Sequence, residues 1–121
     1  MCPDGKTLLV VDDDTAIRES LADLLTDEGY AVVTAAHGGE ALDRLRDGVR
    51  PCLILLDLMM PVMSGPEFYQ AQQADPQLAS IPVVIISADG NVRNKAQPYG
   101  GRYLSKPVKI DTVLDTIERY C

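Results

Sequence analysis

The run Leu53-Ile54-Leu55-Leu56-Asp57-Leu58-Met59-Met60-Pro61 places one carboxylate directly after four apolar residues. A short apolar run without polar alternation is typical of a strand that is buried on both faces of a parallel sheet. Asp57 would then stand at the carboxyl end of a central strand, the edge where open α/β sheets bind ligands. We therefore interpret Asp57 as a residue that takes part in chemistry. The alternative is an aspartate that merely begins a turn.

Three further predicted strands end in polar side chains, which favours the chemical interpretation. These predicted strands and the residues that follow them are 7–11 with Asp12, Asp13 and Asp14, 81–86 with Ser87, and 102–105 with Lys106. Residues 30–35 form another apolar, β-branched run and predict a strand without such an ending. The sequence therefore predicts five strands, four of which deliver polar groups to one edge of a sheet.

Helical patterns separate the predicted strands. Apolar residues at helical spacing or turn signals predict helices through residues 17–25, 40–47, 66–74 and 110–117. Asp14 is the expected N-cap of the first helix, and Gly29 is expected to end it. Residues 89–99 carry few apolar positions before Pro98, so we expect a short or irregular fourth helix. This alternation predicts an α/β fold with a five-stranded parallel sheet, right-handed crossovers and helices on both faces.

Composition limits the class of protein. The 121 residues fit one domain, residues 1–121, and 46% apolar with 24% charged residues is ordinary for a globular protein. A net charge of −7 argues against a nucleic-acid-binding surface and suits a metal site or a basic partner. No apolar run approaches a membrane span, and residues 1–6 lack the form of a signal peptide, so we expect a cytoplasmic protein without a membrane partner.

The cysteines and the single histidine carry no recognisable site pattern. Cys2, Cys52 and Cys121 are odd in number and lack metal-ligand spacing, so we expect reduced thiols. His37 stands beside Gly38 and Gly39 without another metal-ligating residue nearby, and we interpret it as a solvated loop histidine.

The polar strand ends together predict a phosphoryl site. Clustered carboxylates repel one another unless a cation neutralises them, and Mg²⁺ prefers their oxygen ligands. A lysine can then balance the charge of a phosphoryl group, to which a serine hydroxyl can donate a hydrogen bond. The expected chemistry is in-line attack by one carboxylate, supported by positioning and charge neutralisation.

Four segments of the chain resemble those of response-regulator receiver domains. They are Leu9–Asp14, Leu55–Gly65, Ile81–Ala88 and Tyr103–Pro107, and they occur in the family's order across essentially the whole chain. The resemblance implies the flavodoxin-like strand order 2-1-3-4-5. It also implies a single-domain receiver of a two-component or phosphorelay system. Residues 87–106 are a few residues shorter than in the family, and the missing length falls in the fourth helix, which helps form the target-binding face.

The resemblance further implies roles for individual residues. Asp57 would accept a phosphoryl group from a histidine kinase, a phosphotransfer protein or a small phosphodonor. Mg²⁺ would be held by Asp12, Asp13, Asp57 and the backbone carbonyl of Met59. Lys106 and Ser87 would bind the phosphoryl group, and Tyr103 would swing inward behind Ser87 as the readout. Met59, Ala88 and Asp89 would tune access to the phosphoryl group and its lifetime, and the output partner or output domain is not specified.

Three alternatives stay open at this stage. Asp12-Asp13-Asp14-Thr15 faintly resembles the nucleophile motif of haloacid-dehalogenase-like phosphatases, although Ala16 departs from it and no cap domain fits. A receiver-like interaction module that is never phosphorylated is disfavoured by the complete set of acids, serine and lysine. A flavin-binding domain would need a phosphate-cradling loop after the first strand, which is absent. We therefore expect a switch that catalyses only its own phosphorylation and dephosphorylation rather than an enzyme.

Overall fold

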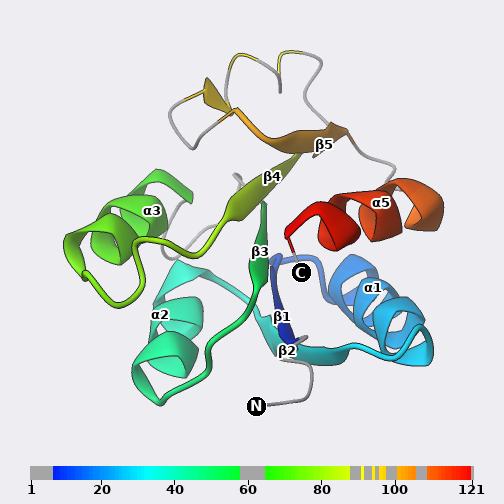
Figure 1. The fold of residues 1–121 in the computed structure, drawn as a ribbon, viewed down its shortest axis with the longest axis horizontal. Coiled ribbons are helices and arrows are strands. Elements are labelled where there is room, and N and C mark those ends of the chain that lie inside the picture. Colours follow the sequence, from blue (N-terminus) through cyan, green and yellow to red (C-terminus); the bar gives the residue numbers. More distant parts are fainter. Residues whose placement is uncertain are drawn as a thin grey trace.

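A five-stranded parallel sheet forms the centre of the molecule in a computed structural model (Figure 1). The structure describes residues 7–57, 65–87, 91, 94, 96, 97, 101–105 and 109–120. The strands are β1 (Thr7–Val11), β2 (Ala31–Ala35), β3 (Leu53–Asp57), β4 (Val83–Ser87) and β5 (Tyr103–Ser105). Their order is β2-β1-β3-β4-β5, and every pairing is parallel, which confirms the predicted fold class and strand order.

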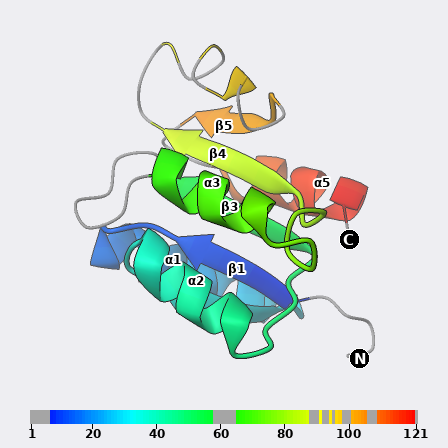
Figure 2. The same cartoon turned by 90° about the vertical axis from the view of Figure 1, so that its left-hand side faces the viewer.

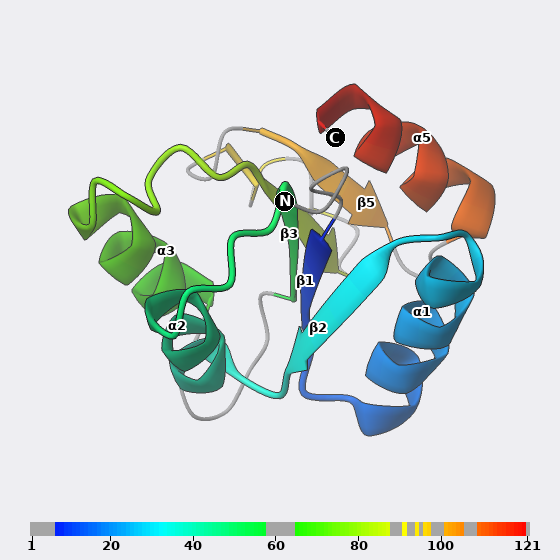
Figure 3. The same cartoon turned by 60° about the horizontal axis from the view of Figure 1, so that its bottom comes forward.

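Two pairs of helices cover the two faces of this sheet (Figures 1 and 3). They are α1 (Thr15–Asp27) with α5 (Ile110–Tyr120) on one face and α2 (Gly38–Arg46) with α3 (Gly65–Ala74) on the other. Figure 2 shows α2 and α3 side by side in front of the sheet. The expected irregular fourth helix falls mostly on residues that the structure does not describe.

Alternate residues of the central strands build two separate cores, because successive side chains of a strand point to opposite faces. Leu9, Val11, Ile54, Leu56, Val83 and Ile85 join the core beneath α2 and α3. Leu8, Val10, Leu53, Leu55, Val84 and Ile86 join the core beneath α1 and α5. All five positions of β3 and of β4 are buried, as the unbroken apolar runs predicted. The carboxyl ends of the central strands are therefore fixed by packing on both faces.

Hydrogen bonds define where α1 and α2 begin and end. Asp14 caps α1, since its Oδ1 accepts a hydrogen bond from the Ile17 N–H at 3.1 Å, as predicted. Gly29 and Gly48 follow the two helices with φ of 98° and 108°. Each donates its N–H to the helix, at 3.0 and 3.2 Å, and so satisfies a carbonyl of the last turn.

His37 has a structural role that the sequence did not reveal. Its Nδ1 accepts a hydrogen bond from the Glu40 N–H at 3.2 Å, which makes it the N-cap of α2. Glu40 reaches back and accepts the Ala36 N–H at 2.9 Å. This reciprocal arrangement resembles a capping box. It explains why α2 begins at Gly38, two residues before the predicted start, and why the half-buried His37 is more than a solvated loop residue.

Cys52 contradicts the expectation of reduced thiols, because it is disulfide-bonded. Its partner lies outside the described residues. Cys52 immediately precedes β3, where its N–H donates to the Thr7 carbonyl at 2.9 Å. The number and spacing of cysteines could not show which of them the fold would bring together.

Replacement of His37 tests the α2 cap. We expect His37→Ala to lower the free energy of unfolding by about 1 kcal/mol, because the Glu40 N–H loses its acceptor. His37→Asn restores a capping oxygen and should recover most of that loss. Urea denaturation followed by circular dichroism measures both variants, and equal stabilities of the alanine and asparagine variants would contradict the capping role.

Candidate functional site

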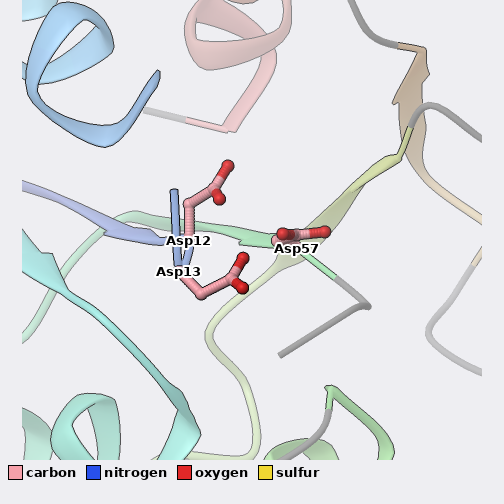
Figure 4. A group of neighbouring side chains, drawn as sticks. All are labelled: Asp12, Asp13 and Asp57. Carbon is pink, nitrogen blue, oxygen red and sulfur yellow. The ribbon is translucent and has the colours of Figure 1, made fainter. Parts of the chain in front are cut away.

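The register of β1 and β3 brings two aspartates to the same edge of the sheet. Val11 pairs with Leu56, so Asp12 and Asp57, which follow them, lie at the same level on adjacent strands. Both side chains are buried, with 2% and 4% of their surface exposed. Asp13 is exposed beside them, and one carboxylate oxygen of each of the three residues lies within 4.8 Å of the others. Figure 4 shows the three side chains gathered where β1 and β3 end.

Hydrogen bonds hold the loop that carries two of these acids. The Asp12 N–H donates to the Ala35 carbonyl at 3.1 Å, which extends the β1–β2 ladder by one residue. The Asp14 N–H donates to Asp12 Oδ1 at 2.9 Å, and Asp14 in turn caps α1. The chain is therefore fixed at the turn from β1 into α1, and the Asp12 carboxylate has a defined orientation.

Arg18 is a residue at this site that sequence reasoning missed. Its Nη1 donates to the backbone carbonyl of Asp12 at 2.7 Å, and its Nη2 lies 3.5 Å from Thr15 Oγ1. The sequence feature that could have indicated this contact is an arginine four residues after the predicted cap Asp14. Long helical side chains point back toward the N-terminus of their helix, so an arginine at this position can reach the loop before it.

The three carboxylates fit a hard divalent cation. For the buried pair Asp12 and Asp57, two charges within 4.8 Å repel each other by on the order of 3 kcal/mol at an effective dielectric constant of about 20. Such a cost is a large part of a domain's stability, which is typically about 5–15 kcal/mol. Oxygen ligands of this kind are those that Mg²⁺ prefers, and the exposed Asp13 leaves the group accessible from solvent. The donor set therefore suits Mg²⁺.

The other predicted site residues fall into two groups. Ser87 is buried at the end of β4, one residue beyond Ile86, the partner of Asp57 on the neighbouring strand. Tyr103 begins β5 with 38% of its surface exposed. The remaining residues lie outside the part of the chain that the structure describes; they are Met59, Ala88, Asp89 and Lys106.

Comparison with known proteins identifies the family. The family model described as "Response regulator receiver domain" matches residues 8–118. The chain belongs to this family. It is 32% identical over 118 residues to the polar-differentiation response regulator DivK of Brucella anthropi, covering 95% of each chain. It is 38% identical over 109 residues to the response regulator Rre1 of Synechocystis, where the match covers 87% of this chain and 47% of that protein.

A solved structure supports the same assignment. The response regulator TrrA of Thermotoga maritima, determined in complex with Mg²⁺–BeF, superimposes with a TM-score of 0.83 at 29% identity. The match covers 96% of this chain and 99% of that one. Asp12, Asp13 and Asp57 are thus clustered as in a Mg²⁺-binding receiver site, and their arrangement is consistent with phosphoaspartate switching.

Membership of this family has two consequences. The chain is a receiver of two-component signalling rather than a conventional enzyme, which disfavours the phosphatase alternative. A receiver implies a cognate histidine kinase. Separately, none of the helices in the described parts of the chain combines the length and the apolar character needed to cross a bilayer.

Asp13→Asn tests the charge balance of the acidic group. Without divalent cations and at low salt, we expect this variant to be more stable than wild type by a few tenths of a kcal/mol to about 1 kcal/mol, because one repelling charge is removed. Millimolar Mg²⁺ should stabilise wild type, whereas the variant should lose most of that gain, since it lacks a ligand.

Urea unfolding with EDTA and with Mg²⁺ provides the comparison. Asp43→Asn, an exposed acid within α2, makes the same charge change away from the site and serves as the control. An Asp13→Asn protein that responds to Mg²⁺ as strongly as the Asp43→Asn protein would contradict the assignment of Asp13 as a ligand.

Proposed function

We propose that this chain is a phosphorylation-dependent switch of a two-component or phosphorelay system and that Asp57 is its phosphoacceptor. The observation that carries the proposal is the burial of Asp57 at the end of the central strand, within 4.8 Å of two further carboxylates. An unneutralised acidic group in this position needs a cation, and a cation beside a carboxylate favours the approach of an anionic phosphoryl group.

The transfer reaction uses a carboxylate oxygen of Asp57 as nucleophile. The donor is a phosphohistidine of a histidine kinase or phosphotransfer protein, or a small acyl phosphate. The oxygen attacks phosphorus in line, so that an O–P bond forms while the P–N or P–O bond of the donor breaks. The leaving imidazole nitrogen or carboxylate oxygen keeps the electron pair, and the product is an aspartyl phosphate.

The acids around Asp57 supply the metal site. Asp12, Asp13, Asp57 and the backbone carbonyl of Met59 would hold Mg²⁺, which when bound neutralises charge on the transferring phosphoryl oxygens. The Asp12 carboxylate is oriented for this role by the Asp14 N–H. The accessible Asp13 completes the set on the solvent side. The register of β1 and β3 places Asp12 and Asp57 at the same level on adjacent strands.

Residues that follow or end the neighbouring strands would bind the phosphoryl group. Lys106 follows β5 in the sequence and would pair with a phosphoryl oxygen, while the Ser87 hydroxyl would donate to another. The position of Ser87 supports this role, because Ser87 lies one residue beyond Ile86, the partner of Asp57 on the neighbouring strand. Ala88 would leave the site open to a donor, and Met59 and Asp89 would flank the path of an attacking water and set the phosphoryl lifetime.

Phosphorylation would shift a two-state equilibrium that a partner detects. Tyr103 is the proposed residue through which the partner detects phosphorylation. Its aromatic side chain is exposed at the start of β5 and would become more buried if it moved inward. The proposed unit is a single receiver domain of residues 1–121 acting in the cytoplasm. It would exchange phosphoryl groups with a kinase or phosphotransfer protein and signal to an output partner or output domain.

Phosphorylation by acetyl phosphate tests this proposal. With Mg²⁺ present, intact mass spectrometry should show one added phosphoryl group on wild type and none on Asp57→Ala, because the nucleophile is lost. The modification should also disappear when EDTA removes the metal. Asp43→Asn should be modified like wild type.

A different pattern would favour the alternatives. Turnover of phosphate monoesters that survives loss of Asp57 but not of Asp12 would indicate phosphatase chemistry. Wild type that stays unmodified with donor and Mg²⁺ would favour a receiver-like module without phosphorylation.

A further inference from the structure

We propose that Arg18 is a positioning residue for the metal-binding acids, because its guanidinium fixes the backbone carbonyl of Asp12 at the turn from β1 into α1. The inference rests on the proposed function of the acidic group as a Mg²⁺ site. It assigns a role to a basic side chain that is neither a strand-end residue nor a metal ligand.

Arg18 donates a hydrogen bond to the backbone carbonyl of Asp12, at the point where the chain leaves β1. Asp12 lies one residue beyond the end of β1 and is 2% exposed, so its carbonyl has little access to water. A buried carbonyl without a hydrogen-bond donor is unfavourable. Arg18 supplies the donor at 2.7 Å, a short charge-assisted hydrogen bond. The interaction therefore links the first turn of α1 to the first acid of the site.

Three hydrogen bonds between described residues contribute to the position of Asp12. Its N–H donates to Ala35 on β2, its Oδ1 accepts from the Asp14 N–H, and its carbonyl accepts from Arg18. The first two come from backbone groups that substitution leaves in place. Arg18 is the side-chain donor among these three bonds, and its removal would take away the donor that holds the peptide between Asp12 and Asp13. We expect both acids to be held less firmly as a result.

Two effects of Arg18 on Mg²⁺ binding oppose each other. Its positive charge repels a cation, whereas its hydrogen bond preorders two ligands. Arg18 is only half-buried, so solvent and salt screen the repulsion. Loss of residues that orient metal ligands commonly weakens affinity by about 10–100-fold. We therefore expect the positioning effect to outweigh the repulsion, so that loss of Arg18 weakens Mg²⁺ affinity by about tenfold.

Three variants separate these effects. Arg18→Met removes both the charge and the hydrogen bond while keeping a long helix-forming side chain. Arg18→Lys keeps the charge and one donor. Arg46→Met makes the same change at an exposed position in the last turn of α2, at the end of that helix remote from His37, and is the matched control.

The first measurement is Mg²⁺ affinity by isothermal titration calorimetry without phosphodonor. Arg18→Met should weaken binding by roughly tenfold, and Arg18→Lys should recover most of that loss. Arg46→Met should bind like wild type. Unchanged or tighter binding by Arg18→Met, or no recovery by Arg18→Lys, would overturn the proposal. Wild type that fails to bind Mg²⁺ would instead contradict the proposed function of the site.

The second measurement uses metal-free protein and is independent of that function. Amide hydrogen exchange should accelerate at the Asp14 N–H by roughly tenfold in Arg18→Met, because its acceptor Asp12 is no longer fixed. Exchange in the buried strands should stay at the wild-type rate. Equal protection of the Asp14 amide in wild type and Arg18→Met would contradict the positioning role.

Discussion

The parallel register between β1 and β3 is the constraint on which the rest of the site depends. Because Val11 pairs with Leu56, the residues that follow them, Asp12 and Asp57, are held at one level on adjacent strands. The apolar cores on the two faces of the sheet fix this register, since a shift by one residue would turn every buried side chain to the wrong face. Packing energy thus maintains an arrangement of like charges that is unfavourable by itself.

The surroundings of the acids show how the molecule accommodates this arrangement. Asp12 is held by hydrogen bonds from Asp14 and Arg18 and by the extension of the ladder to Ala35. These contacts leave the acids clustered rather than allowing them to separate into solvent. A site that is preordered in this way loses little conformational freedom when a cation binds. Such an arrangement is consistent with the phosphoaspartate switching of a receiver domain.

Sequence reasoning predicted much of this structure because the relevant signals are local. Unbroken apolar runs predicted the buried strands β3 and β4, and Asp14 was correctly predicted as a helix cap. The strand order came from the family resemblance, since strand periodicity does not encode which strands are neighbours. The grouping of Asp12, Asp13 and Asp57 followed once the strands were parallel, because their carboxyl ends must then share an edge.

The contacts that the sequence did not predict depend on side-chain direction or on proximity between distant segments. Arg18 reaches backward along its helix, His37 uses a ring nitrogen where a hydroxyl or carboxylate is usual, and Cys52 is paired through the fold. None of these leaves a periodic signal. The roles expected of Lys106 and of the tuning residues stay predictions, because those residues lie outside the described part of the chain.

The most direct test of the central claim is a crystal structure of the protein soaked with Mn²⁺, which substitutes for Mg²⁺ and can be located by anomalous scattering. We expect one ion in contact with carboxylate oxygens of Asp12, Asp13 and Asp57. An ion bound elsewhere, or no ion at a saturating concentration, would contradict the claim that these three residues form the metal site.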